Sequence, residues 1–219
     1  KTHNTIQSMK RILLAIMPFM LAASSFSGAK QQSANNSPAG ISGRLAQNDI
    51  LTGAQQTEKY LPLLKGKRVA MAINNTSVIE GKLSMDTLLK LGVNIVRGFG
   101  PEHGFRGEAS AGAKISDETD AKTGIPLISL YGKRYKPGPE DMKGIDVMIF
   151  DMQDVGVRFY TYLSTLHYIM EACAENNVEL IILDRPNPND SYVDGPVLEK
   201  GFESFVGMHP IPILHGLTF

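Results

Sequence analysis

Short apolar runs alternate with segments of helical periodicity over most of the chain. Apolar runs that predict buried strands occur at residues 68–73, 94–98, 125–130, 146–150 and 179–183. Between them, hydrophobic residues recur at helical spacing, which predicts helices over 51–64, 84–91 and 161–175 and a short helical turn over 139–143. Strands that are apolar throughout are buried on both faces, as in a parallel sheet. The pattern therefore predicts an α/β fold with a doubly wound, mostly parallel sheet and helices on both faces.

Polar residues gather where the predicted strands end. The strand-end segments are 74–77, which includes Asn75, then 99–107, 151–158 and 184–189. The carboxyl ends of parallel strands share one edge of a sheet, and ligands bind outside that edge. The sequence therefore predicts a functional site formed by these segments.

Carboxylates dominate the chemistry available at this edge. The candidate acids are Glu102, Asp151, Asp154 and Asp184, and His103 lies beside the first of them. A pair of acids with different pKa values can act as general acid and as base or nucleophile, which is the usual equipment for cleaving a glycosidic bond. Arginines can hold an anionic substrate group by paired hydrogen bonds, and Arg106, Arg158 and Arg185 are the candidates.

Structural roles are the alternatives for several of these residues. Asp184 and Arg185 can form an ion pair at a strand end. Asp154 can cap the following turn and pair with Arg158. His167 lies near the apolar stripe of its predicted helix, where a packed core residue is the more common case.

Composition narrows the function classes. The 219 residues contain 22 Lys plus Arg and 22 Asp plus Glu, so the net charge is zero, which argues against a nucleic-acid partner. The single cysteine, Cys173, excludes an intrachain disulfide and a cysteine-based metal site. Residues 98–101 lack the third glycine of a dinucleotide-binding fingerprint, and the histidines show no metal-ligand spacing. We expect neither a cofactor nor a metal.

The first residues have the pattern of a secretory signal peptide. A basic start at residues 9–11 precedes an apolar run over 12–23 and small residues at 27–29. We expect residues 1–29 to comprise upstream residues and a signal peptide (about 9–29), residues 30–48 a flexible polar leader, and residues 49–219 the folded domain. The mature protein would then be periplasmic or secreted, without a stable membrane anchor. An uncleaved anchor is the alternative.

Several strand-end motifs resemble one family. Residues 101–107 (with Pro-Glu-His-Gly), 129–132, 150–162, 183–188 and 215–218 (His-Gly-Leu-Thr) resemble the NamZ-type exo-β-N-acetylmuramidases. The resemblance implies a Rossmann-like N-terminal catalytic domain, a smaller C-terminal domain and a cleft between them. It implies a glycoside hydrolase that releases N-acetylmuramic acid from the non-reducing end of peptidoglycan fragments, so that muramic acid saccharides are the expected partners. Because relatives continue beyond the His-Gly-Leu-Thr motif, we expect the C-terminal domain to be largely absent from this chain.

The resemblance adds to the residue roles. Glu102 becomes the leading catalytic acid, with His103 beside it and Asp151 or Asp154 as the second acid. The predicted substrate-binding residues are Asn75, Arg106, Gln153, Arg158, Tyr160, Asp184, Arg185 and Asn187. Muramic acid carries a lactyl carboxylate, which is an anionic group that the arginines could bind. A truncated, non-catalytic domain that binds a cell-wall sugar is the main alternative, and a cytoplasmic nucleotide-binding enzyme is a third.

Overall fold

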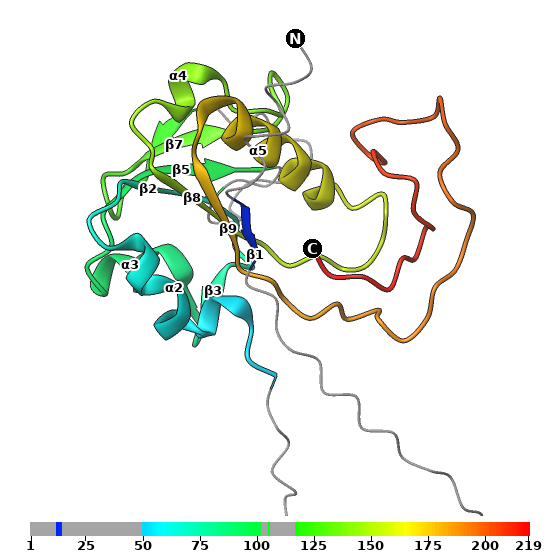
Figure 1. Cartoon of the computed structure of the whole chain (residues 1–219), viewed down its shortest axis with the longest axis horizontal. Coiled ribbons are helices and arrows are strands. Elements are labelled where there is room, and N and C mark those ends of the chain that lie inside the picture. The colour runs from blue at the N-terminus through cyan, green and yellow to red at the C-terminus, as the bar shows by residue number, and fades with distance from the viewer. Residues whose placement is uncertain (1–11, 15–49, 102–104, 106–116) are drawn as a thin grey trace, which may run out of the picture.

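The computed structural model describes residues 12–14, 50–101, 105 and 117–219, and a parallel sheet forms its centre (Figure 1). Within these residues the strand order is β1-β9-β8-β2-β5-β7-β6. All neighbours are parallel except β6, which pairs antiparallel with β7. The strands are β1 (Ile12–Leu14), β2 (Val69–Ile73), β5 (Ile95–Gly100), β6 (Glu118–Thr119), β7 (Pro126–Ser129), β8 (Val147–Asp151) and β9 (Glu179–Ile182).

The chain winds outward from the middle of this sheet in both directions. From β2 it moves through β5 to β7, and then crosses back to β8 and β9 on the other side of β2. This is the strand order of Rossmann folds, and its topological switch point lies between β2 and β8. The predicted doubly wound, mostly parallel α/β fold is confirmed.

Helices cover both faces of the sheet. α2 (Thr57–Leu64) and α3 (Ser84–Lys90) lie on one face, and α4 (Pro139–Met142) and α5 (Tyr162–Asn176) lie on the other (Figure 1). Successive side chains of β2 alternate between the two cores, so that Met71 packs with the first pair of helices and Ala72 with the second. Both faces of the strand are fully buried, which explains its unbroken apolar sequence.

Some elements differ from the predicted ones. The helix expected from residue 51 begins at Thr57, after the 3₁₀ turn η2 (Gly53–Gln55). The backbone N–H of Gly53 donates to the Asp184 carbonyl at 2.7 Å, and a Cβ at Gly53 would lie 2.7 Å from the Asp184 nitrogen. This close approach to the end of β9 replaces the first helical turns.

Four short strands among the described residues were not predicted. β3 (Val78–Ile79) and β4 (Lys82–Leu83) form an antiparallel hairpin after β2. β6 extends the sheet beyond β7. β1 pairs with β9 and lies in the segment assigned to the signal peptide, which stays a prediction.

After β9, residues 183–219 contain no helix or named strand and form a long excursion that returns to the sheet (Figure 1). Leu214 bridges both Val157 and Asp194, and the Phe219 ring meets the Phe150 ring edge-on at 5.1 Å. The end of the chain is thereby placed at the carboxyl end of β8. Among the described residues, none of the helices has the length and hydropathy needed to cross a bilayer.

Candidate functional site

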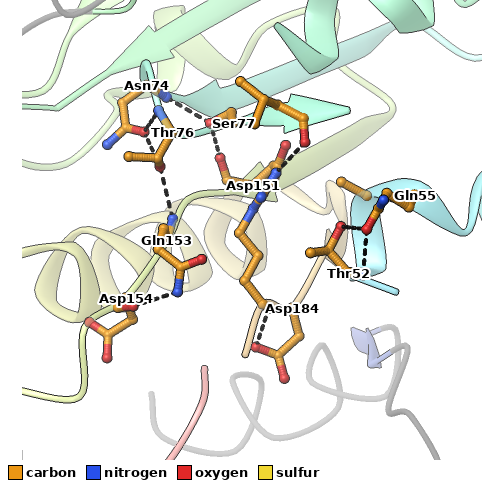
Figure 2. A network of polar contacts seen from close by, with 12 residues as sticks. Thr52, Gln55, Asn74, Thr76, Ser77, Asp151, Gln153, Asp154 and Asp184 are labelled. Carbon is orange, nitrogen blue, oxygen red and sulfur yellow. Dashed lines mark hydrogen bonds and ion pairs between the residues drawn. The ribbon is translucent and has the colours of Figure 1, made fainter. Parts of the chain in front are cut away.

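Hydrogen bonds tie together the two strand ends at the switch point (Figure 2). After β2, the Asn74 side-chain oxygen accepts from the Thr76 N–H at 2.9 Å and from its hydroxyl at 2.6 Å. The Thr76 hydroxyl in turn accepts from the Gln153 N–H at 3.0 Å. The Ser77 hydroxyl accepts from the Asn74 N–H at 2.9 Å and donates to the Asp151 carbonyl. The loops after β2 and β8 therefore form one connected edge.

Asp151 is the acid at the end of β8, and it forms a buried ion pair. Arg185 Nε lies 2.7 Å from Asp151 Oδ1, with the two side chains 5% and 0% exposed. Arg185 Nη2 also donates to the Val78 carbonyl at 3.1 Å, so the pair joins β8, β9 and the β3–β4 hairpin. Burial raises the pKa of Asp151, and the bond to Arg185 opposes that rise. The ion pair considered for Arg185 forms with Asp151, not with Asp184.

Asp154 lies three residues further along the same loop in a different environment. Its Oδ2 accepts from the Gly156 N–H at 2.9 Å, so it does cap its own turn, whereas Arg158 is not its partner. Among the described residues, the buried Oδ1 has no hydrogen-bond partner. Burial raises the pKa of Asp154, and the Gly156 N–H and His215 oppose the rise. A buried carboxyl with a perturbed pKa at a ligand-binding edge is a candidate for acid–base chemistry.

His215 faces Asp154 from the C-terminal segment. Its Nε2 lies 3.5 Å from Asp154 Oδ2, and its Nδ1 accepts from the Leu217 N–H at 3.2 Å. Sequence reasoning gave this histidine no role, although its His-Gly-Leu-Thr motif contributed to the family resemblance. That motif was the available signal.

Three further predicted residues lie at the same edge and bond to the protein. Gln153 Nε2 donates to the carbonyls of Asp154 at 2.6 Å and Pro186 at 2.8 Å. Asp184 Oδ2 accepts from the Thr218 hydroxyl at 2.6 Å. Asn187 Nδ2 donates to the Leu217 carbonyl at 3.0 Å. These contacts connect the loops after β8 and β9 with the last residues of the chain.

Of the remaining predicted site residues, those that the structure describes are not part of the hydrogen-bond network between the loops after β2, β8 and β9. The guanidinium of Arg158 donates to the carbonyls of Pro196 at 2.8 Å and Ile211 at 2.5 Å, so it holds the C-terminal segment. Tyr160 is partly exposed and meets the Tyr162 ring edge-on at 4.8 Å. Asn75 is exposed beside the Asn74 network. Glu102, His103 and Arg106 lie outside the described residues.

The described part of the chain does not favour a metal site or a cysteine nucleophile. It contains no group of three or more His, Cys, Asp or Glu side chains that could hold a metal ion. Burial raises the pKa of the Cys173 thiol to about 12, so this cysteine is not an activated nucleophile.

The fold and this edge define a Rossmann-like α/β domain with acidic side chains at its switch point. The family model described as "Exo-beta-N-acetylmuramidase NamZ, N-terminal" matches residues 69–219. The chain belongs to this family.

Known relatives agree with this assignment. The chain is 48% identical over 165 residues to the peptidoglycan beta-N-acetylmuramidase NamZ of Bacillus subtilis (strain 168), an alignment that covers 73% of this chain and 39% of that protein. It is also similar to crystal structures of two DUF1343 family proteins from Bacteroides fragilis NCTC 9343. These are 47% and 46% identical, with TM-scores of 0.67 and 0.69. Each comparison covers 76% of this chain and 43% of the solved chain. The chain thus spans about two-fifths of the length of these relatives.

Proposed function

We propose that this chain provides the Rossmann-like N-terminal part of an exo-acting β-N-acetylmuramidase. The reaction would release N-acetylmuramic acid from the non-reducing end of peptidoglycan fragments. The family match over residues 69–219 carries the proposal. The name of the Bacillus subtilis relative and the acidic residues at the switch point support it.

In this proposal Glu102 protonates the glycosidic oxygen as general acid or acid/base. Asp154 is the favoured second carboxyl, because no arginine is paired with it among the described residues, Oδ1 has no hydrogen-bond partner there, and burial raises the pKa of the group. Asp151 is less suited, since it is fully buried and paired with Arg185. The distance between the two reacting carboxyls would decide between retention and inversion of configuration.

The lactyl carboxylate of the substrate needs a cationic partner. Arg185 is bonded to Asp151, and the guanidinium of Arg158 binds two backbone carbonyls. Both side chains are therefore committed to contacts within the protein. Arg106 is then the favoured candidate among the three predicted arginines.

Hydrolysis of a chromogenic N-acetylmuramic acid glycoside tests the proposal. The assay would use this chain and the longest reading frame that contains it, with the Bacillus subtilis relative as reference. Glu102→Gln should abolish turnover because the amide cannot donate a proton to the leaving oxygen. Glu118→Gln, at an exposed position in β6, is the matched control and should leave the rate unchanged. Equal rates in wild type and Glu102→Gln would contradict the assignment.

A non-catalytic domain that binds a cell-wall sugar is the second candidate. The observation that favours it is that Asp151, Gln153 and Asn187 at the predicted site are engaged in contacts within the protein. Calorimetric titration with N-acetylmuramic acid separates the two candidates. Binding without turnover in either form of the protein would support the binding domain and overturn the hydrolase.

We also propose that the protein is exported to the periplasm or secreted. The basic, apolar and small-residue pattern over about residues 9–29 supports this. Mass spectrometry of the mature N-terminus is the test. Cleavage near residues 27–29 is expected, and an intact apolar segment would favour the anchored or cytoplasmic alternative.

A further inference from the structure

The two ring nitrogens of His215 have different surroundings, and this determines where its proton lies. Nδ1 accepts a hydrogen bond from the Leu217 N–H at 3.2 Å. An accepting nitrogen carries no proton, so the neutral ring is protonated at Nε2. Nε2 faces Asp154 Oδ2 at 3.5 Å, and both side chains are buried. Nε2 has no hydrogen-bond partner among the described residues, so the Asp154 carboxyl at 3.5 Å is a neighbour of the ring and not a hydrogen-bond acceptor for it.

Backbone contacts place the ring independently of Asp154. The His215 N–H donates to the Gly156 carbonyl at 3.1 Å, and neighbouring Leu214 bridges Val157. The Leu217 bond then sets the orientation of the imidazole. These contacts hold His215, which belongs to the C-terminal segment, against the loop that carries Asp154.

The two oxygens of Asp154 differ as a result. Oδ2 has the Gly156 N–H at 2.9 Å and His215 on its side. Oδ1 is buried and has no hydrogen-bond partner among the described residues. Among the described residues, Asp184 also acts on Asp154, and its like charge opposes ionisation. Hydrogen-bonding capacity therefore remains at Oδ1.

We propose that His215 is a positioning residue for Asp154. It favours the ionised carboxyl electrostatically from the Oδ2 side, where the Gly156 N–H also donates, and Oδ1 remains to accept a hydrogen bond or proton from a substrate hydroxyl or a water molecule. The catalytic consequence rests on the proposed hydrolase function, whereas the orientation and charge of the pair do not.

Nuclear magnetic resonance tests the pair without any need for turnover. The imidazole ¹⁵N shifts of His215 should report the Nε2–H tautomer at neutral pH, and the carboxyl ¹³C shift of Asp154 should report its titration. His215→Phe keeps a ring but removes both nitrogens, so the pKa of Asp154 should rise by about one unit, a tenfold change in its ionisation equilibrium. His215→Gln retains an N–H donor and should cause a smaller rise. His209→Gln changes another histidine of the same segment and should cause none.

Kinetics test the consequence for the reaction. His215→Phe should lower kcat about tenfold at the wild-type optimum and leave KM nearly unchanged, because a positioning residue acts through Asp154 and not through substrate binding. The limb of the pH profile that Asp154 sets should move to higher pH, and His215→Gln should recover part of the rate. Thermal melting of each variant shows whether it remains folded.

The outcomes separate the two ideas. An Nδ1–H tautomer, or an Asp154 titration that neither variant shifts, would overturn the positioning role. If His215→Phe does not fold, the wild-type tautomer and the His215→Gln titration decide the same question. Absence of turnover in every form, together with the expected titrations, would refute the hydrolase and leave the paired arrangement established.

Discussion

Asp151 and Asp154 are buried acids three residues apart, and their surroundings differ. Asp151 has a full ionic partner in Arg185 at 2.7 Å. Asp154 has backbone donors, chiefly the Gly156 N–H, and a histidine at 3.5 Å, but no arginine partner among the described residues. In that part of the chain one oxygen of each acid has no hydrogen-bond partner, so the arginine is what distinguishes them. The first arrangement joins three elements, and the second retains capacity for chemistry. We therefore infer a structural role for Asp151 and an acid–base role for Asp154.

Arg185→Met should destabilise the fold strongly. The substitution leaves the Asp151 carboxyl buried without its counter-charge and removes the bond to the Val78 carbonyl. A loss of about 3–5 kcal/mol in the free energy of unfolding is expected, as for other broken buried pairs. Urea denaturation measures it. Arg68→Met is the control, because it breaks the solvent-exposed pair with Asp146 and should hardly move the midpoint. Similar shifts in both variants would contradict the structural role.

The raised pKa of Asp154 predicts a pH-dependent stability difference between wild type and Asp154→Asn. Burial raises the pKa of this carboxyl in the folded protein above its unfolded value of about 3.9. At pH values between the unfolded and the folded pKa, the folded state therefore binds more protons than the unfolded state. The contribution of Asp154 to stability therefore falls as pH rises from about 4 through the folded pKa. Between about pH 3 and pH 8, the urea midpoint of the wild type should fall relative to that of Asp154→Asn as pH rises. A difference that is constant with pH would contradict the raised pKa.

Among the elements, those with a clear hydrophobic period were predictable and the short ones were not. The predicted apolar runs correspond to β2, β5, β7, β8 and β9, and the helix predicted over 161–175 corresponds to α5. The β3–β4 hairpin has only two residues in each strand, which is too short for any period to show. The first helix starts late because Gly53 packs on the backbone of β9, a contact between distant segments. Local patterns carry no information on such contacts.

The loop between β8 and α5 depends on a glycine. Gly156 has a φ of +73°, and a Cβ there would lie 2.4 Å from the side-chain atoms of Asn187. Gly156→Ala should therefore incur the conformational cost of about 1–2 kcal/mol and an additional steric cost. Gly66→Ala is a matched control, because Gly66 has a φ of +72° with open space around it. Chemical denaturation should show the larger loss for Gly156→Ala. Equal losses would mean that Asn187 moves aside freely.

For the whole molecule, the sequence predicted which polar segments meet at the carboxyl edge of the sheet, but not the contacts that join them. Parallel strand ends share an edge whatever the strand order, so the polar clusters were informative by themselves. The Asp151–Arg185 and Asp154–His215 pairs join residues far apart in the chain, and their formation depends on strand order and side-chain direction. Residues 190–219 have no hydrophobic period, so their return to the β8 loop was not predictable.

The path of that returning segment predicts a separate unit of local stability. The Arg158 guanidinium holds it through the carbonyls of Pro196 and Ile211. Backbone hydrogen bonds to Ile213 and from His215 attach it to the same loop. Arg158→Met keeps the aliphatic stem and removes both hydrogen bonds. Amide exchange at Asp194 and Leu214, which bond to each other, should accelerate about tenfold or more.

The sheet should respond differently to the same substitution. Amides of β8 exchange through global unfolding, so their rates should change much less than those of the segment. Arg134→Met is the control, because this arginine bonds to the Ser129 carbonyl and to Asp117 near β7, and its loss should leave Asp194 and Leu214 unaffected. Equal acceleration in β8 and the segment after Arg158→Met would show that the two unfold as one unit. The segment would then be part of the core fold and not a separate unit attached to the edge that carries Asp154.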